Sequence, residues 1–305
     1  MKIVYKIEEV KECIKEWRKE GLSIGFVPTM GYLHEGHESL IKRAMENDRV
    51  VVSIFVNPMQ FGPKEDLASY PRDLERDSSR CMENGADLIF HPNPEEMYKE
   101  DFYTYVDMSV LTEELCGLSR PLHFRGVCTV VLKLFNIVTP DRAYFGEKDA
   151  QQLAVIKRMV TDLNVNVEII GCPIIRESDG LAMSSRNSYL SETERKAALI
   201  LYNSIKLGKQ MIKEGERDAA VLVSAMKAFI QKEPLAKIDY VKAVDAMTMR
   251  QAEKLNGTVL IAMAVYIGKT RLIDNFTFKC EEGGGVYNED YYVKRKNSSC
   301  YRSTG

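Results

Sequence analysis

Two histidines three residues apart lie in a glycine-rich segment that follows an apolar stretch. The segment PTMGYLHEGH, residues 28–37, contains His34 and His37, two of the four histidines in the chain. A strand ending at Val27, a glycine-bearing turn and a helix starting near His37 would place unpaired backbone N–H groups where an anion can dock. Imidazoles at positions i and i+3 of a first turn lie on the same side of the helix, so both can donate to one phosphate chain. The segment therefore predicts a phosphate-binding turn.

Other interpretations of this segment can be compared with that one. HEGH is one residue shorter than the zinc-protease pattern HExxH, and His91 and His123 lie at no recognisable ligand spacing, which disfavours zinc. No GxGxxG follows a predicted strand, which disfavours a nicotinamide dinucleotide. A purely structural pair of helix-capping histidines stays open when this segment is considered alone.

Amide side chains follow the next apolar stretch. In VNPMQFG, residues 56–62, Asn57 and Gln60 come just after the run VVVSIFV. Open parallel sheets bind ligands beyond the carboxyl ends of their strands, so we expect both amides to point into a cleft. Because Asn-Pro also starts ordinary turns, a purely structural loop is the alternative.

A second strand, turn and helix arrangement occurs in YFGEKDAQQL, residues 144–153. Gly146 lies at the turn, Lys148 is a cation beside the helix start, and Gln152 falls on the first turn. A lysine next to a helix N-terminus can meet a phosphate, whereas a lone turn lysine is usually only solvated. The position favours the first interpretation.

Two further polar segments carry weaker signals. GLAMSSRN, residues 180–187, places two hydroxyls and Arg186 in a linker that could close over a bound nucleotide. YPRDLERD, residues 70–77, supplies carboxylates, of which one could face a magnesium ion held mainly by phosphates and waters. An ordinary charged helix face explains the second segment almost equally well.

The elements that must position these residues alternate between apolar strands and amphipathic helices through the first 175 residues. This alternation predicts a Rossmann-like, doubly wound α/β domain with a parallel sheet. The run VVVSIFV is apolar almost throughout, as expected for a strand covered on both faces. The expected strands are 22–27, 50–56, 86–91, 143–146 and 165–171, and the expected helices follow His37 and span 126–138 and 149–163.

After Pro173 the sequence becomes a polar loop, and we place a domain boundary there. Ser191 can cap the following helix, and Glu194 can complete a capping box. Helices over about 192–214 and 218–231, followed by three strand-like runs, predict a smaller α+β domain. The expected division is 1–175 for the Rossmann-like domain, 176–279 for the C-terminal domain, and 280–305 for a polar, glycine-bearing tail.

The bulk properties bound the partners. The 305 residues carry 42 basic and 44 acidic side chains, so a net charge of −2 gives no basic footprint for nucleic acid. The first twelve residues lack the apolar core of a signal peptide, and no apolar run reaches the roughly 20 residues of a membrane span. Seven scattered cysteines without a CxxC pair fit reduced thiols. We therefore expect a cytosolic protein with small-molecule partners and no membrane contact.

In this order, PTMGYLHEGH, FVNPMQFG, YPRDLERD, HFRGVCTVV, FGEKDAQQL and RESDGLAMSSRNSYLS closely resemble the pantothenate synthetase (pantoate:beta-alanine ligase) family of the HxGH nucleotidyltransferase superfamily. The resemblance covers roughly residues 1–275. It implies a Rossmann-like domain, a C-terminal lid domain, a homodimer, and condensation of pantoate with beta-alanine at the expense of ATP. The implied products are pantothenate, AMP and pyrophosphate, formed through a pantoyl adenylate.

The resemblance also implies roles for individual residues. Gln60 and Gln152 match the glutamines that hold pantoate, with Asn57 beside them, and His37 matches the proton donor. Charge stabilisation would fall to His34, His37, Lys148 and Arg186, and Ser184 would belong to the closing loop. The implied ATP-binding residues are Met30, Gly31, Tyr32, Leu33, His34, Glu35, Gly36, His37, Gly146, Glu147, Lys148, Asp149, Ile175, Met183, Ser184, Ser185 and Arg186.

Two features depart from the family pattern. Asp77 matches a family acidic residue and is the candidate ligand for Mg²⁺, but Arg76 stands where the family often has a second acid. The last 25 or so residues have no family counterpart. Rival functions are an HxGH enzyme that stops at nucleotide transfer, as a phosphopantetheine adenylyltransferase does, and a catalytically silent nucleotide-binding protein.

Overall fold

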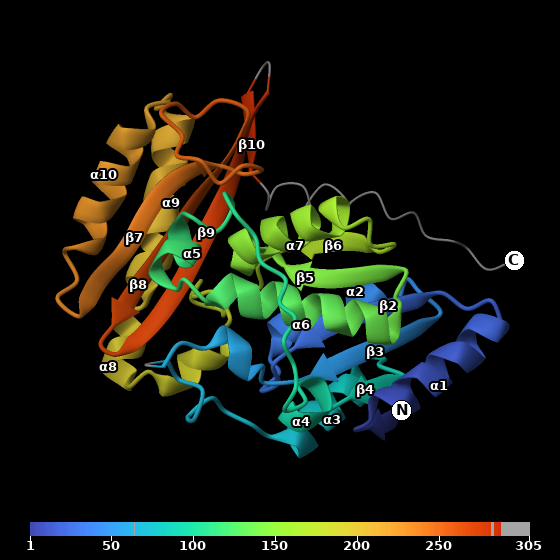
Figure 1. The fold of residues 1–305 in the computed structure, drawn as a ribbon. Coiled ribbons are helices and arrows are strands. Elements are labelled where there is room, and N and C mark those ends of the chain that lie inside the picture. The colour runs from blue at the N-terminus through green and yellow to red at the C-terminus, as the bar shows by residue number, and fades with distance from the viewer. Residues whose placement is uncertain (64, 282–283, 288–305) are drawn as a thin grey trace, which may run out of the picture. The chain divides into compact units, whose positions relative to one another are not determined.

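A computed structural model describes residues 1–63, 65–281 and 284–287. The chain forms two compact units (Figure 1). The first comprises the described residues of Met1–Arg176 together with Met183–Ser188, and the second comprises Glu177–Ala182 and the described residues from Tyr189 onward. Residues 183–188, which the sequence placed in the C-terminal domain, thus group with the first unit.

The first unit is built on a six-stranded parallel sheet in the order β1-β4-β3-β2-β5-β6. This confirms the predicted doubly wound α/β class. The strands are β1 (Lys2–Val4), β2 (Ile24–Thr29), β3 (Arg49–Ile54), β4 (Leu88–Phe90), β5 (Arg142–Gly146) and β6 (Glu168–Cys172).

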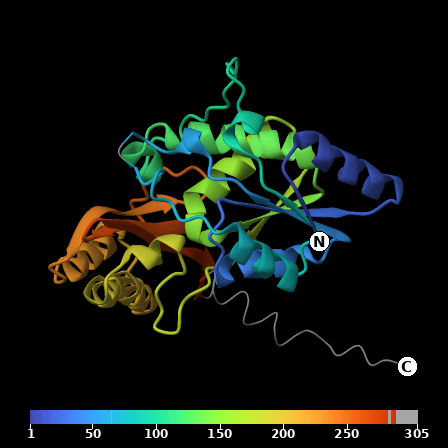
Figure 2. The same ribbon diagram turned by 90° about the horizontal axis from the view of Figure 1, so that it is seen from below.

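Helices cover both faces of this sheet. Figure 2 shows α1 and α6 on one face and α2 and α3 on the other, while α7 packs beside α6. The elements are α1 (Ile7–Lys19), α2 (Glu35–Ala44), α3 (Leu74–Glu83), α4 (Pro94–Met97), α5 (Leu115–Ser119), α6 (His123–Val138) and α7 (Ala150–Asp162), with 3-10 turns η1 (Pro58–Gln60), η2 (Glu147–Asp149) and η3 (Ser185–Tyr189).

Burial explains why the apolar stretches form this sheet. Strand β3 is buried along most of its length because helices lie on both of its faces, as its continuous apolar run predicts. Strand β1 and helix α1 were not predicted. A signal was present, since Ile7, Val10, Ile14 and Trp17 recur at helical spacing, and Val10 and Ile14 are buried.

The strand order fixes where a ligand can bind. Strands β2 and β5 are neighbours although they are far apart in sequence, and the strand order changes direction between them. Such a switch point opens a crevice at the carboxyl ends of the strands. The loops after β2, β3, β5 and β6 all leave that edge, and each carries a residue proposed from the sequence to bind substrate.

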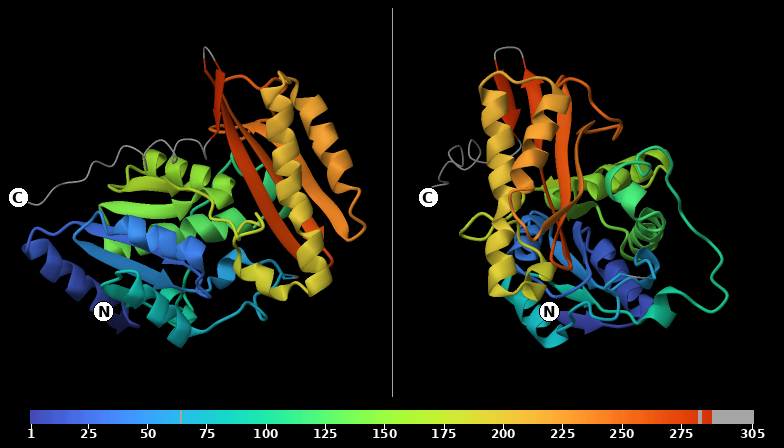
Figure 3. Two further views of the ribbon diagram at one scale, coloured as in Figure 1. Left: turned by 180° about the vertical axis from the view of Figure 1, so that it is seen from behind. Right: turned by 90° about the vertical axis from the view of Figure 1, so that its left-hand side faces the viewer.

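The second unit has a four-stranded antiparallel sheet in the order β10-β9-β8-β7. Helices α9 and α10 lie side by side on this sheet (Figure 3). Ser191 caps α8 and Glu194 completes the predicted capping box. The elements are α8 (Glu192–Ala197), α9 (Leu199–Lys213), α10 (Ala219–Ile230), β7 (Ala236–Asp245), β8 (Thr258–Ile267), β9 (Thr270–Glu281) and β10 (Gly284–Tyr287).

Strand β10 lies in the segment that the sequence indicated to be an irregular tail. It pairs with the end of β9, and this pairing could not be seen in the tail's own composition. Residues 288–305 of the expected tail lie outside the described residues. Within the part that the structure describes, none of the helices combines the length and the apolar character that crossing a membrane requires.

Candidate active site

The turn after β2 has an unusual backbone. Gly31 and Tyr32 both adopt left-handed φ angles, 84° and 50°. Asp77 of α3 holds this turn from the side, since its two carboxylate oxygens accept the N–H groups of Tyr32 and Leu33, both at 2.7 Å. The side chain of Leu33 is fully buried in the core, so only its backbone can serve the predicted nucleotide site.

Helix α2 begins at Glu35, and the two histidines cap it. Nδ1 of His34 accepts the Gly36 N–H at 3.1 Å, and Nδ1 of His37 accepts the His34 N–H at 3.3 Å. The ring centroids lie 4.1 Å apart. The capping interpretation is therefore correct, but because Nδ1 is the acceptor, each neutral ring carries its proton on Nε2. Capping thus leaves two Nε2–H donors of fixed tautomer at a helix N-terminus.

The electrostatic surroundings keep both rings neutral near pH 7. Burial, then His37 and Lys148, lower the pKa of His34 to about 2. Burial and Lys148 lower the pKa of His37 to about 4, while Asp149 acts in the opposite direction. The donors in this site are therefore uncharged imidazoles beside a lysine, so an incoming phosphate would meet N–H groups rather than two cations.

The turn after β5 places Lys148 close enough to both histidines to lower their pKa values, and Asp149 close enough to His37 to raise its pKa. Residues of η2, Glu147–Asp149, lead directly into α7. Adjacent pairing of β2 and β5 explains this meeting, because the two turns leave neighbouring strand ends. The structure thus brings together Lys148 and the HxGH segment, as predicted from the sequence.

Gln60 and Asn57 differ in role. Gln60 is 8% exposed, and its Nε2 donates to Sδ of Met30 at 3.0 Å. A thioether is a weak acceptor, so a ligand oxygen can replace it at little cost. Asn57 is 1% exposed and donates from its amide nitrogen to Oε1 of Gln60 and to the carbonyl of Gly126. Its oxygen accepts from Met59 N and from the Tyr98 hydroxyl.

The expectation that Asn57 points its amide into the cleft is therefore corrected. Both of its amide hydrogens are used inside the protein, so it fixes Gln60 instead. Helix α6 packs tightly on this turn, because a Cβ added at Gly126 would lie 2.4 Å from the Met59 carbonyl oxygen. The segment that carries Gln60 is thus held by Asn57 and by the close packing of Gly126 of α6.

The two adjacent glutamines of α7 also have separate positions. Gln151 is buried, and its amide binds Cys116 N, the Leu111 carbonyl and the Glu114 carbonyl. It was not singled out from the sequence. Gln152, predicted to hold an acid, is partly exposed on the same first turn. The structure therefore assigns the first glutamine to loop anchoring and leaves the second available for a ligand.

The MSSR segment belongs to the first unit and lies against the HxGH turn. Ser185 donates to the Tyr32 carbonyl at 3.2 Å, and Met183 N donates to the Ile175 carbonyl at 3.0 Å. A Cβ at Gly36 would come within 3.9 Å of Met183 Cβ. These contacts join Ile175, Met183 and Ser185 to the predicted nucleotide site.

Arg186 does not present a bare guanidinium. Its Nε and Nη2 bind the two carboxylate oxygens of Asp66, each at 2.9 Å. A parallel pair joins Arg120 to Glu65 at 2.6 and 2.7 Å, and Arg120 also reaches the Gln60 carbonyl. Sequence analysis missed Glu65, Asp66 and Arg120, whose partners lie 55 and 120 residues apart. Charge alone gave no signal for these pairs.

His123 is a further site residue that spacing rules did not identify. Its Nδ1 lies 3.0 Å from the Gln60 carbonyl, and burial followed by Arg120 lowers its pKa to about 4. A neutral ring that donates to this carbonyl also holds the Gln60 turn in place, in addition to Asn57 and Gly126.

Asp77 does not fit the magnesium role expected for it. The side chain is 1% exposed, and each oxygen already accepts a backbone N–H. Across the described ranges, no group of three or more His, Cys, Asp or Glu side chains is arranged to hold a metal ion.

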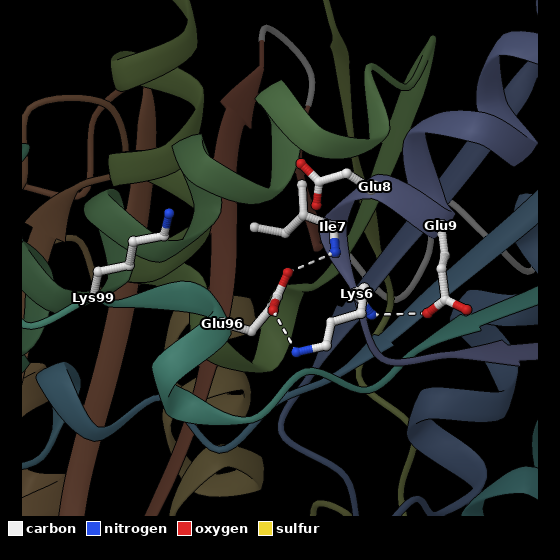
Figure 4. Close-up of a pocket in the computed structure, with 6 residues that line it drawn as sticks. All are labelled: Lys6, Ile7, Glu8, Glu9, Glu96 and Lys99. Atoms are coloured by element: carbon white, nitrogen blue, oxygen red, sulfur yellow. Dashed lines mark hydrogen bonds and ion pairs between the residues drawn. The ribbon is translucent and has the colours of Figure 1, made fainter.

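A separate hollow of about 440 Å³ lies at the N-terminus of α1, and no residue predicted for the site lines it (Figure 4). Glu96 fills it from α4, accepting from Ile7 N at 2.9 Å and from Lys6 Nζ at 3.0 Å. Glu9 accepts the Lys6 and Tyr5 N–H groups. This hollow is a helix end capped by carboxylates.

Known proteins resemble this chain over nearly its whole length. The family model described as Pantoate-beta-alanine ligase matches residues 2–277. A pantothenate synthetase of Ruminiclostridium cellulolyticum is 69% identical over 278 residues, 91% of this chain and 99% of the relative. One from Clostridium botulinum (strain Loch Maree) is 62% identical over 280 residues, which are 92% of this chain and 100% of the relative.

Solved structures agree. A pantothenate synthetase from Thermus thermophilus has a TM-score of 0.86 and 44% identity, covering 90% of this chain and 98% of its own. A Francisella tularensis pantoate-beta-alanine ligase, complexed with beta-gamma ATP and beta-alanine, has a TM-score of 0.74 and 38% identity. The match covers 90% of this chain and 97% of that chain.

The fold and site together define a doubly wound α/β enzyme of the HxGH class, with its histidine turn at the switch point of the sheet. Within that class, the chain belongs to the pantoate-beta-alanine ligase family, and it is a ligase.

Proposed function

We propose that the protein condenses pantoate with beta-alanine in two steps, through a pantoyl adenylate, with release of pyrophosphate and then AMP. Its family membership supports the overall reaction. The observation that carries the stepwise mechanism is the pair of Nε2–H donors at the N-terminus of α2, with Lys148 beside them. Such a site suits the triphosphate of ATP.

In the first step an oxygen of the pantoate carboxylate attacks the α-phosphorus, and the bond to pyrophosphate breaks. A free carboxylate is a poor acyl donor because oxide would have to leave, and adenylation replaces oxide with AMP. His34, His37 and Lys148 stabilise the growing negative charge on the phosphates. Neutral imidazoles suit this task, since they donate hydrogen bonds without first losing or gaining a proton.

Recognition of the acid falls to Gln60 and Gln152. Gln60 is buried, and its Nε2 donates to the Met30 sulfur, a weak acceptor, so a pantoate oxygen that replaces the sulfur improves that hydrogen bond. His123 and Asn57 hold Gln60 in place for this exchange.

Arg186 changes partners in this proposal. Its guanidinium is bound to Asp66, and a phosphate is a competing bidentate acceptor of greater charge. We propose that ATP draws Arg186 away from Asp66, and that Ser184 and Ser185 then close over the phosphates with it. Closure would exclude water from the reactive anhydride.

In the second step the neutral amine of beta-alanine attacks the pantoyl carbonyl. The new C–N bond forms, the bond to AMP breaks, and one proton is released from the amine. Mg²⁺ would enter bound to the phosphates of ATP and to water rather than to a protein cage. We further propose a cytosolic homodimer, because the cytosol is a setting in which thiols such as those of the six described cysteines stay reduced.

Isotope exchange tests this function directly. Labelled pyrophosphate should enter ATP only when pantoate is present, and AMP should accumulate only when pantoate and beta-alanine are both supplied. An enzyme that stops at nucleotide transfer would release no AMP with these substrates, and a silent binding protein would show neither reaction. Exchange without pantoate would overturn the adenylate mechanism.

A further inference from the structure

Asp77 lies beside the turn that follows β2 and accepts hydrogen bonds from two of its backbone N–H groups. The consecutive left-handed residues Gly31 and Tyr32 aim the N–H groups of Tyr32 and Leu33 toward one side. Successive N–H groups arranged this way form a concave anion site, which in other proteins holds a phosphate. Here the anion is internal, because Asp77 fills the site with both oxygens at 2.7 Å.

This contact is directly connected to the two imidazoles. Leu33 precedes His34, whose ring caps α2, and the His34 N–H in turn fixes Nδ1 of His37. The neighbouring Arg76 of α3 also contacts the turn, since its guanidinium lies 4.6 Å from the centre of the Tyr32 ring. A shift of the turn would therefore move both histidines together.

The same contact argues against a metal ion on Asp77. Both oxygens face the positive ends of N–H dipoles, so a cation bound there would displace or oppose them. Space is also short, since a Cβ at Gly31 would lie 3.0 Å from Oδ2 of Asp77. An octahedral Mg²⁺ with its water shell needs more room and free oxygen lone pairs.

We propose that Asp77 is a positioning residue that sets the direction and tautomer of His34 and His37 through the turn, and that it is not a magnesium ligand. The consequence for catalysis rests on the proposed function, whereas the consequence for the imidazoles does not.

The test compares Asp77→Asn with Glu75→Gln, a matched carboxylate-to-amide change at an exposed position of the same helix. An asparagine can accept from only one of the two N–H groups and directs its own NH₂ at the other. In the Asp77 variant, we expect fast hydrogen exchange of the Tyr32 or Leu33 amide and mixed ¹⁵N tautomer signals for both imidazoles. Pantoate-dependent pyrophosphate exchange should fall about a hundredfold, while the Mg²⁺ concentration for half-maximal rate stays unchanged.

Three results would overturn the proposal. Unaltered imidazole signals in Asp77→Asn would do so, as would a large rise in the Mg²⁺ requirement. The third is Mn²⁺, added to the wild-type protein without nucleotide, selectively broadening the Tyr32 and Leu33 amides. If Asp77→Asn does not fold, Gly31→Ala decides, because its Cβ crowds Oδ2 and should disturb the same signals. A wild-type protein without any exchange activity would refute the proposed function yet leave the imidazole result standing.

Discussion

Helices α1 and α2 both start at the carboxyl edge of the same sheet, yet their N-termini are capped by opposite kinds of group. At α1, carboxylates of Glu96 and Glu9 accept the backbone N–H groups, and the Ile7 N–H helps to hold the pKa of Glu96 below its usual value (Figure 4). At α2, neutral imidazole nitrogens do the same work.

The difference shows what makes a helix end receptive to a ligand. A carboxylate cap satisfies the N–H groups and also cancels the positive end of the helix dipole. An imidazole cap accepts an N–H at Nδ1 and carries its own N–H at Nε2. The capped helix end therefore still presents a hydrogen-bond donor to a ligand. Two helix ends of similar geometry thus differ in whether they can receive an anion.

Replacing the imidazole cap of α2 with a carboxylate should break this contrast most severely. His34→Asp keeps a good N-cap but adds a negative charge, and we expect pantoate-dependent pyrophosphate exchange to fall about a thousandfold. His34→Asn, a neutral cap without the second donor, should lose about a hundredfold. Equal rates in the two variants would show that cap charge is irrelevant.

Removing the cation beside α2 should have the next largest effect. Lys148→Ala is expected to keep its fold and lose about a hundredfold in turnover, about 3 kcal/mol of transition-state stabilisation. The matched control is Lys99→Ala, which removes a lysine lining the hollow at α1. Steady-state rates and thermal unfolding measure both, and near-normal turnover of the Lys148 variant would refute its role.

The neutral state of the α2 caps should appear in the pH dependence of stability. Folding lowers the pKa of His37 from 6.5 to about 4, so the unfolded chain binds more protons between these values. Stability from this ring is complete above about pH 6.5 and declines as the pH falls toward 4, by up to about 1.4 kcal/mol per pH unit. Urea unfolding at several pH values gives the free energy of unfolding, which should depend less steeply on pH in His37→Asn than in wild type. An equal pH dependence in the two proteins would contradict this expectation.

The smallest effect concerns Asp66, the carboxylate that is ion-paired with Arg186. Asp66→Asn should release the guanidinium and tighten ATP binding about fivefold, equivalent to about 1 kcal/mol. Asp162→Asn, which breaks an exposed ion pair with Arg158, is the control and should leave binding unchanged. Calorimetric titration measures both, and weaker binding to the Asp66 variant would mean that Asp66 helps to build the site.

Local signals explain what could be predicted from the sequence. Strand β3 follows from its apolar run and α2 from its periodic face, and the parallel sheet follows from their alternation. Because parallel strands end at one edge, the turns bearing His37, Gln60 and Lys148 could be expected to meet before any coordinates were known.

Long-range partners explain what could not. Whether Asn57 points outward or inward depends on a carbonyl of Gly126, 69 residues away. The guanidinium of Arg186 is hydrogen-bonded to a carboxylate 120 residues away. Asp77 looked like a metal ligand because its type is suited to that role, and only the left-handed turn at Gly31 reveals that its oxygens are already committed.

The close approach of Gly126 to the Met59 carbonyl has a practical consequence for redesign. Since main chain presses on main chain there, enlarging residue 126 would displace the whole segment that carries Gln60. Met30, in contrast, touches the Gln60 amide only through a side-chain sulfur and can be shortened without moving backbone. Attempts to admit bulkier acids should therefore begin at Met30.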